Sequence, residues 1–192
     1  MPNFLSPVTI NGIMNVPGVI YTSTASVSIA TATTSTLIGA GVGTLILPAN
    51  FFIVGRVVRL KAFGYVTTIS APNLITFLVK LGASTIANTN NGTSLAPTAS
   101  MTAKPWEMDL VITCRTVGSS GTVFPVGNIK MSSNATAAFN AANLAEVLFC
   151  STATPAAVTI NTTASQTVDF QLTDAGIGTT VVCTNFSVEV LN

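Results

Sequence analysis

Hydrophobic and polar residues alternate one by one along several short segments of the chain. In residues 106–115 the even positions are apolar, whereas the odd positions include Glu107 and Asp109. Residues 168–172 alternate strictly. A period of two is typical of a β-strand with one buried face. The pattern therefore predicts antiparallel strands that cover a hydrophobic core with one face only.

The same alternation predicts which side chains form the core. In residues 182–190 the even positions, from Val182 to Val190, form the more apolar face. Residues 74–81 are apolar almost throughout, which predicts a central strand covered on both faces. The seven side chains for which burial is predicted most directly are Trp106, Leu110, Ile112, Val168, Phe170, Phe186 and Val188.

Turn-forming residues divide these segments at fairly even intervals. Gly118-Ser119-Ser120-Gly121 predicts a hairpin between strands 106–116 and 122–131. Residues 134–146 have a helix-like composition but are equally compatible with a loop. About eight to ten strands are expected. We therefore predict an all-β fold in which residues 25–192 form an antiparallel, jelly-roll-like β-sandwich domain.

Residues 1–24 have a different character and predict an extended N-terminal arm. Pro2, Pro7 and Pro17 favour extended backbone, and the apolar residues between them are too scattered to fold alone. We expect the arm to lie across a neighbouring molecule, although packing on its own sandwich is the alternative. The predicted contact residues of the arm are Phe4, Leu5, Val8, Ile10, Ile13 and Met14.

Composition changes this picture because charge is nearly absent. Charged residues make up 7% of the 192 residues and the formal net charge is +1, whereas 30 Thr, 16 Ser and 15 Asn supply polarity. An average soluble protein carries about 25% charged residues. A nucleic-acid-binding protein is not expected, because no basic surface is available. A surface so poor in charge favours an obligate homo-oligomer, in which neutral polar groups are buried between subunits.

Catalytic and metal-binding chemistry has little support. There is no histidine, which excludes Ser-His-Asp and Cys-His catalysis and histidine-ligated metals. Cys114, Cys150 and Cys183 form no CxxC pair and are expected to be reduced and buried. We therefore predict no enzyme activity, no cofactor and no metal.

One set of residues on the non-core side of the strands predicts an interface. Phe63 and Tyr65 share the parity of Arg59 and Lys61, so aromatic and charged side chains lie on the same face. A loop that covers the aromatics is the alternative. The carboxylates Glu107 and Asp109 also share one face, which is compatible with calcium binding or glycoside hydrolysis. Pairing with Arg59, Lys61 or Arg115 is expected instead.

The N-terminus lacks a basic segment followed by an unbroken apolar run, so neither a secretory signal nor a membrane helix is expected. We predict synthesis in a cytoplasm and no association with membranes.

Three segments resemble structural proteins of tailed bacteriophages and prophages. They are the strand end in residues 55–64 (Gly-Arg-Val-Val-Arg-Leu-Lys-Ala-Phe-Gly), residues 76–82 ending in Leu-Gly, and residues 104–110, where Pro-Trp opens a strand. The closing residues 186–190 are also similar, so the resemblance covers about residues 45–192.

The resemblance implies a β-sandwich virion protein that is often trimeric. The expected function is a capsid decoration, or cement, protein on the capsid surface, where a homotrimer binds major capsid proteins. The alternative is a tail or tail-fibre component that binds carbohydrate of the host surface. The lack of shaft repeats and the N-terminal arm favour the decoration protein.

Overall fold

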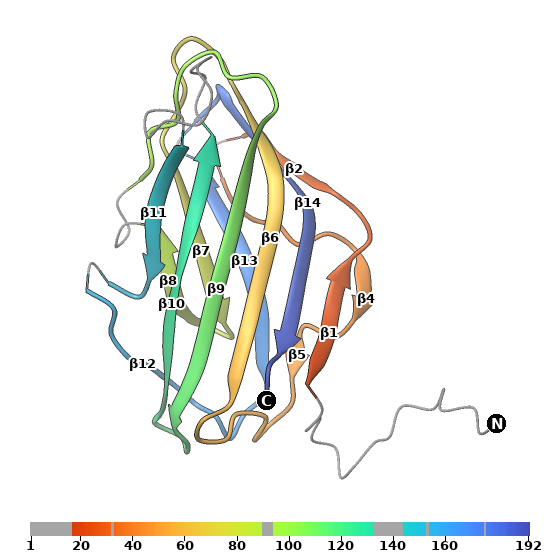
Figure 1. Cartoon of the computed structure of the whole chain (residues 1–192), viewed down its shortest axis with the longest axis vertical. Helices are drawn as coiled ribbons and strands as arrows, with labels where there is room; N and C mark the ends of the chain where they lie inside the picture. Colours follow the sequence, from red (N-terminus) through yellow and green to blue (C-terminus); the bar gives the residue numbers. More distant parts are fainter. Residues whose placement is uncertain (1–16, 32, 90–93, 133–143, 153, 175) are drawn as a thin grey trace, which may run out of the picture.

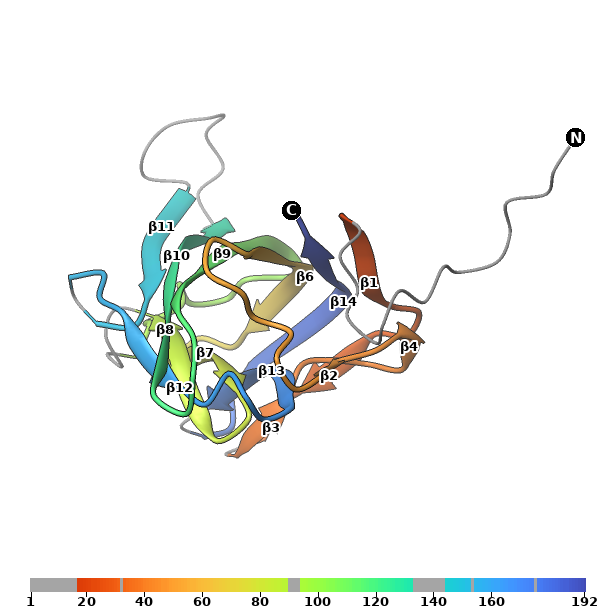
Figure 2. The ribbon, with the colours of Figure 1, turned by 90° about the horizontal axis from the view of Figure 1, so that it is seen from below.

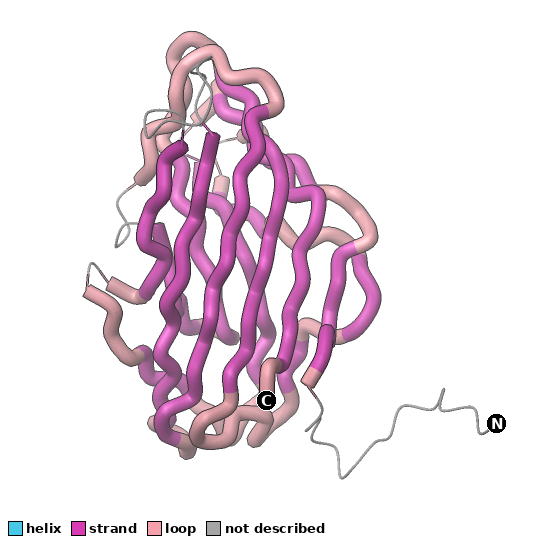
Figure 3. The backbone as a smooth tube through the Cα atoms, viewed as in Figure 1, coloured by secondary structure: helices cyan, strands magenta, loops and turns pink. Residues whose placement is uncertain are grey.

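The chain folds into two layers of antiparallel β-strands (Figures 1 and 3), as seen in a computed structural model that describes residues 17–31, 33–89, 94–132, 144–152, 154–174 and 176–192. The described residues contain strands and no helix, which confirms the predicted all-β class. The first eight strands are β1 (Gly18–Ser23), β2 (Val27–Ile29), β3 (Thr34–Thr36), β4 (Gly41–Gly43), β5 (Ile46–Leu47), β6 (Val57–Thr68), β7 (Ile75–Leu81) and β8 (Ser84–Thr89). The remaining six are β9 (Lys104–Thr116), β10 (Gly121–Ser132), β11 (Leu144–Cys150), β12 (Val158–Ile160), β13 (Gln166–Asp174) and β14 (Thr179–Val190).

The strand order is that of a jelly roll. Four antiparallel pairs are nested along the sequence: β7 with β8, β6 with β9, β3 with β13, and β1 with β14. Such nesting describes one long hairpin that has been rolled up into two layers. One layer has the order β1-β14-β6-β9, and the other has the order β3-β13-β7-β8.

Strands β10 and β11 extend the first layer and join it to the second. The hairpin β9–β10 forms at the predicted turn, and β11 pairs with β10 on one side and with β8 on the other. The sheet therefore curls into a half-barrel along this side, as Figure 2 shows. The opposite side ends in the short strand β4, which pairs with β1.

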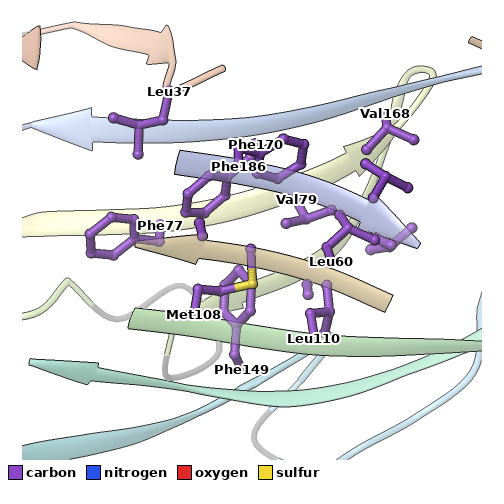
Figure 4. Packing of buried hydrophobic residues seen from close by; sticks show 14 of the residues in the cluster. Leu37, Leu60, Phe77, Val79, Met108, Leu110, Phe149, Val168, Phe170 and Phe186 are labelled. Carbon is purple, nitrogen blue, oxygen red and sulfur yellow. The ribbon is translucent and has the colours of Figure 1, made fainter. Parts of the chain in front are cut away.

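Aromatic rings fill the space between the two layers (Figure 4). Phe170 of β13 stacks between Phe77 and Phe186, with ring centroids 5.8 and 5.9 Å away. Trp106 of β9 lies 5.2 Å from Phe77 and 6.1 Å from Phe170. All seven predicted core residues are buried, which confirms the parity of these strands. The three cysteines are also buried and free.

Several local predictions are wrong. Residues 18–23 are strand β1, paired with β14 and β4, and do not belong to an arm. Strand β7 buries alternate side chains only, because its other face lies on the outside of the second layer. Residues 144–146 begin strand β11, whereas residues 133–143 lie outside the described part of the chain. The described residues form fourteen strands instead of the eight to ten expected, because five of these strands have only two or three residues.

Candidate interaction surface

The structure brings together the charged and aromatic residues that the sequence singled out. Arg59, Lys61, Phe63 and Tyr65 project from β6, and Glu107 and Asp109 project from β9, which is its direct neighbour. Odd-numbered side chains of both strands point away from the core, because the even-numbered side chains are buried. We call the solvent side of β6, β9, β10, β11 and β14 the outer face.

Most of the chain's charge lies on this outer face. Of the 13 charged residues in the sequence, eight are placed here by strand register and parity. They are Arg59, Lys61, Glu107, Asp109, Arg115, Lys130, Glu146 and Glu189. Antiparallel pairing brings neighbouring side chains within reach of one another, so the charges other than Arg115 form a patch, whereas the guanidinium of Arg115 lies over the Phe124 ring.

Ion pairs and amides organise this patch. The guanidinium of Arg59 binds Asp109 with both its Nε, at 2.8 Å from Oδ1, and a terminal nitrogen. Lys130 Nζ lies 3.5 Å from Glu107 Oε1. Asn128 donates from Nδ2 to Glu146 Oε1 at 2.8 Å. Both carboxylates therefore pair with cations across strands, as expected, although Glu107 pairs with Lys130, which the sequence analysis did not consider.

The neighbouring cations of the patch favour the ionised form of Asp109. The hydrogen bond from Arg59 lowers the pKa of the Asp109 carboxyl below its usual value, and the charges of Lys61 and Lys130 act in the same direction. Asp109 thus remains ionised at neutral pH. Lys61 stands opposite Asp109 in the strand register, yet among the described residues it has no ion-pair partner of its own. Its ammonium group is available to an external acceptor.

A shallow hollow of about 250 Å³ lies at the centre of the patch. Its wall includes Arg59, Lys61, Phe63, Asn128 and Lys130. Phe63 is 40% exposed, so no described loop covers the aromatic side of the hollow. Tyr65 is exposed to a similar degree. Exposed aromatic and arginine side chains are enriched in protein–protein interfaces.

Sequence reasoning missed the contribution of β10 and β11. Asn128, Lys130 and Glu146 complete the patch, but they lie more than 15 residues from Glu107 and Asp109 in the chain. The hairpin turn at residues 118–121 carried the relevant signal, because it sets β10 antiparallel to β9. Counting back from that turn places Met131 opposite Glu107, and the bulge between Thr122 and Val123 shifts the register by one residue, which brings Lys130 there instead.

The remaining sequence predictions concern the N-terminal arm, metal binding, the cysteines and membrane helices. Phe4, Leu5, Val8, Ile10, Ile13 and Met14 lie outside the described residues. Within the described ranges, no three side chains of His, Cys, Asp or Glu gather closely enough to hold a metal ion. Burial raises the pKa of the Cys183 thiol to about 11, which keeps it protonated and unreactive. In the same ranges there is no helix long and apolar enough to span a membrane.

Comparison with protein-family models, with curated proteins and with solved structures finds no match for this chain. The resemblance to phage structural proteins rests on the strand ends in residues 55–64, 76–82, 104–110 and 186–190.

Proposed function

We propose that this chain is a non-enzymatic virion structural protein that decorates a bacteriophage capsid. A homotrimer binds the major capsid proteins and stabilises the head without chemistry of its own. Asp109 and Glu107 are each paired with a cation from a neighbouring strand. We therefore assign these carboxylates to binding and not to catalysis.

The observation that supports this proposal most is the segregation of charge. A chain with only 7% charged residues concentrates eight of its 13 charges on one face, together with two exposed aromatics. Concentrated charges of both signs provide specificity and register for one partner. The rest of the surface carries few charges, among them Lys80 and Asp169 on the second layer, and is suited to close contact with sister subunits, because burying Thr, Ser and Asn avoids the cost of desolvating ions.

Reversing one free charge tests the role of the outer face. Lys61→Glu is expected to weaken binding to virions that lack this protein by roughly tenfold, because a lost attraction becomes a repulsion. Co-sedimentation with the particles measures the affinity. The matched control is Lys80→Glu, which reverses the same charge on β7 in the opposite layer.

The control variant should bind like the unchanged protein. Equal binding by the Lys61→Glu protein would contradict docking through the outer face. Binding to purified host polysaccharide instead of particles would favour the carbohydrate-binding tail component.

A further inference from the structure

The charged residues are absent from one side of the sheet. None of the 13 charged side chains precedes Arg56 in the sequence. Strands β1 and β4 therefore carry only neutral residues, and they form the end of the first layer opposite to β10 and β11. We call these two strands the charge-free edge. Natural proteins normally place charges on such edges to prevent pairing with other molecules.

Strand β4 leaves this edge open and projects one apolar side chain from it. In the described part of the chain, β4 pairs with β1 on one side and with no strand on the other. A Cβ at Gly41 or Gly43 would collide with the backbone of β1, so both positions require glycine. Val42 is the single side chain of the strand and is 68% exposed. It stands opposite Thr22 on the same side of the sheet as the outer face.

A hollow lined mainly by apolar residues lies near the start of β1. The start of β1 and the end of β14 enclose a hollow of about 300 Å³, lined by Pro17, Gly18, Val19, Glu189, Val190 and Leu191. Val19 and Leu191 expose 59% and 44% of their surfaces there. The projecting valine of β4 and this largely apolar hollow between β1 and β14, with Glu189 as its one charged residue, therefore lie in different places. Two different complementary patches on one molecule are what a closed ring of identical subunits requires.

We propose that the charge-free edge is the contact between copies of this chain, with Val42 of one copy packed into the hollow at Val19 and Leu191 of the next. A second copy fits because its strands β1 and β4 also carry no charge, so Glu189 is the single charged residue that lines the contact. A partner recognised by charge would find nothing to pair with on β1 or β4. This inference locates the subunit contact of the proposed trimer and rests on that proposed function.

Sedimentation equilibrium of the full chain at micromolar concentration tests the contact. The unchanged protein is expected to sediment as a trimer. Val42→Asp should lower the mass to that of a monomer, because it places a carboxylate in a largely apolar hollow and close to the carboxylate of Glu189. Val19→Asp should do the same from the other side of the contact. The matched control is Ile177→Asp, which adds the same charge at a residue that is 83% exposed between β13 and β14.

Each result either supports or overturns the proposed contact between subunits. A trimer that persists in Val42→Asp and Val19→Asp, a monomeric unchanged protein, or dissociation of the Ile177→Asp control overturns the proposal. All three substituted positions are exposed in the single chain, and an unchanged circular dichroism spectrum verifies that the variants fold. Particle binding is measured separately: a trimer that dissociates as expected but never binds virions refutes the capsid function and retains the contact.

Discussion

Replacing Phe170 with alanine is expected to lower the free energy of unfolding by about 3–5 kcal/mol, the usual cost of removing a buried aromatic side chain. Phe170 is fully buried and contacts rings from both layers, namely Phe77, Trp106 and Phe186. The cavity left behind would lie between the two layers among three other buried rings, so little relaxation is available. Urea denaturation measures the loss.

The matched control for this core variant is Phe63→Ala. It removes the same side chain from the outer face, where Phe63 is substantially exposed, and should cost less than about 1 kcal/mol. A loss below about 1 kcal/mol for Phe170→Ala would show that the ring stack is not the contact that holds the layers together.

Deleting residues 1–16 is expected to reduce particle binding at least tenfold while the sandwich stays folded. The fold should survive because β1 begins at Gly18 and its pairing with β14 is retained. The removed segment contains six apolar residues predicted to contact a partner, and each one buried contributes about 1.5–3 kcal/mol. Loss of even one such contact corresponds to about a tenfold change in affinity.

A full-length control separates the apolar contacts from the length of the arm. In this variant Phe4, Leu5 and Ile10 are replaced by serine, and binding should fall as it does in the deletion. Co-sedimentation gives the affinity, and circular dichroism verifies the strands. Unchanged binding by the truncated protein would mean that residues 1–16 do not contribute to docking.

Alternation predicted the long strands well because each of them has one face in a shared core. Leu110 and Ile112 of β9, and Val168 and Phe170 of β13, are buried as the period of two requires. The outer-face residues Arg59, Lys61, Glu107 and Asp109 were predicted for the same reason, since the parity of a strand defines both of its faces. Their mutual proximity needed only the pairing of β6 with β9.

Interruptions of the period account for much of what the sequence did not reveal. In β14 the register shifts between Cys183 and Asn185, so Val181 and Cys183 point inward before the bulge and Phe186 after it. A single parity for residues 182–190 is therefore wrong. The bulge cannot be recognised from the hydrophobic pattern, because Val182 is apolar and therefore fits either parity.

The short edge strands could not be predicted from the sequence for a different reason. Strands β2 to β5 have two or three residues each, which is too few for alternation to be recognised. Gly41-Val42-Gly43 is typical of a loop, yet it forms β4 because glycine allows its backbone to approach β1 closely. Tertiary pairing determines these strands: β4 pairs with β1 about 20 positions away, whereas β2, β3 and β5 pair with β13 or β14 more than 100 positions away.

The most direct measurement is cryo-electron microscopy of virions that contain this protein, compared with virions that lack it. The proposed function predicts difference density on the outside of the capsid, at three-fold positions between major capsid proteins. The two-layered sandwich should fit that density as a trimer, with its outer face toward the capsid and its charge-free edges toward one another. Difference density at the tail tip, or none on the head, would contradict the proposal.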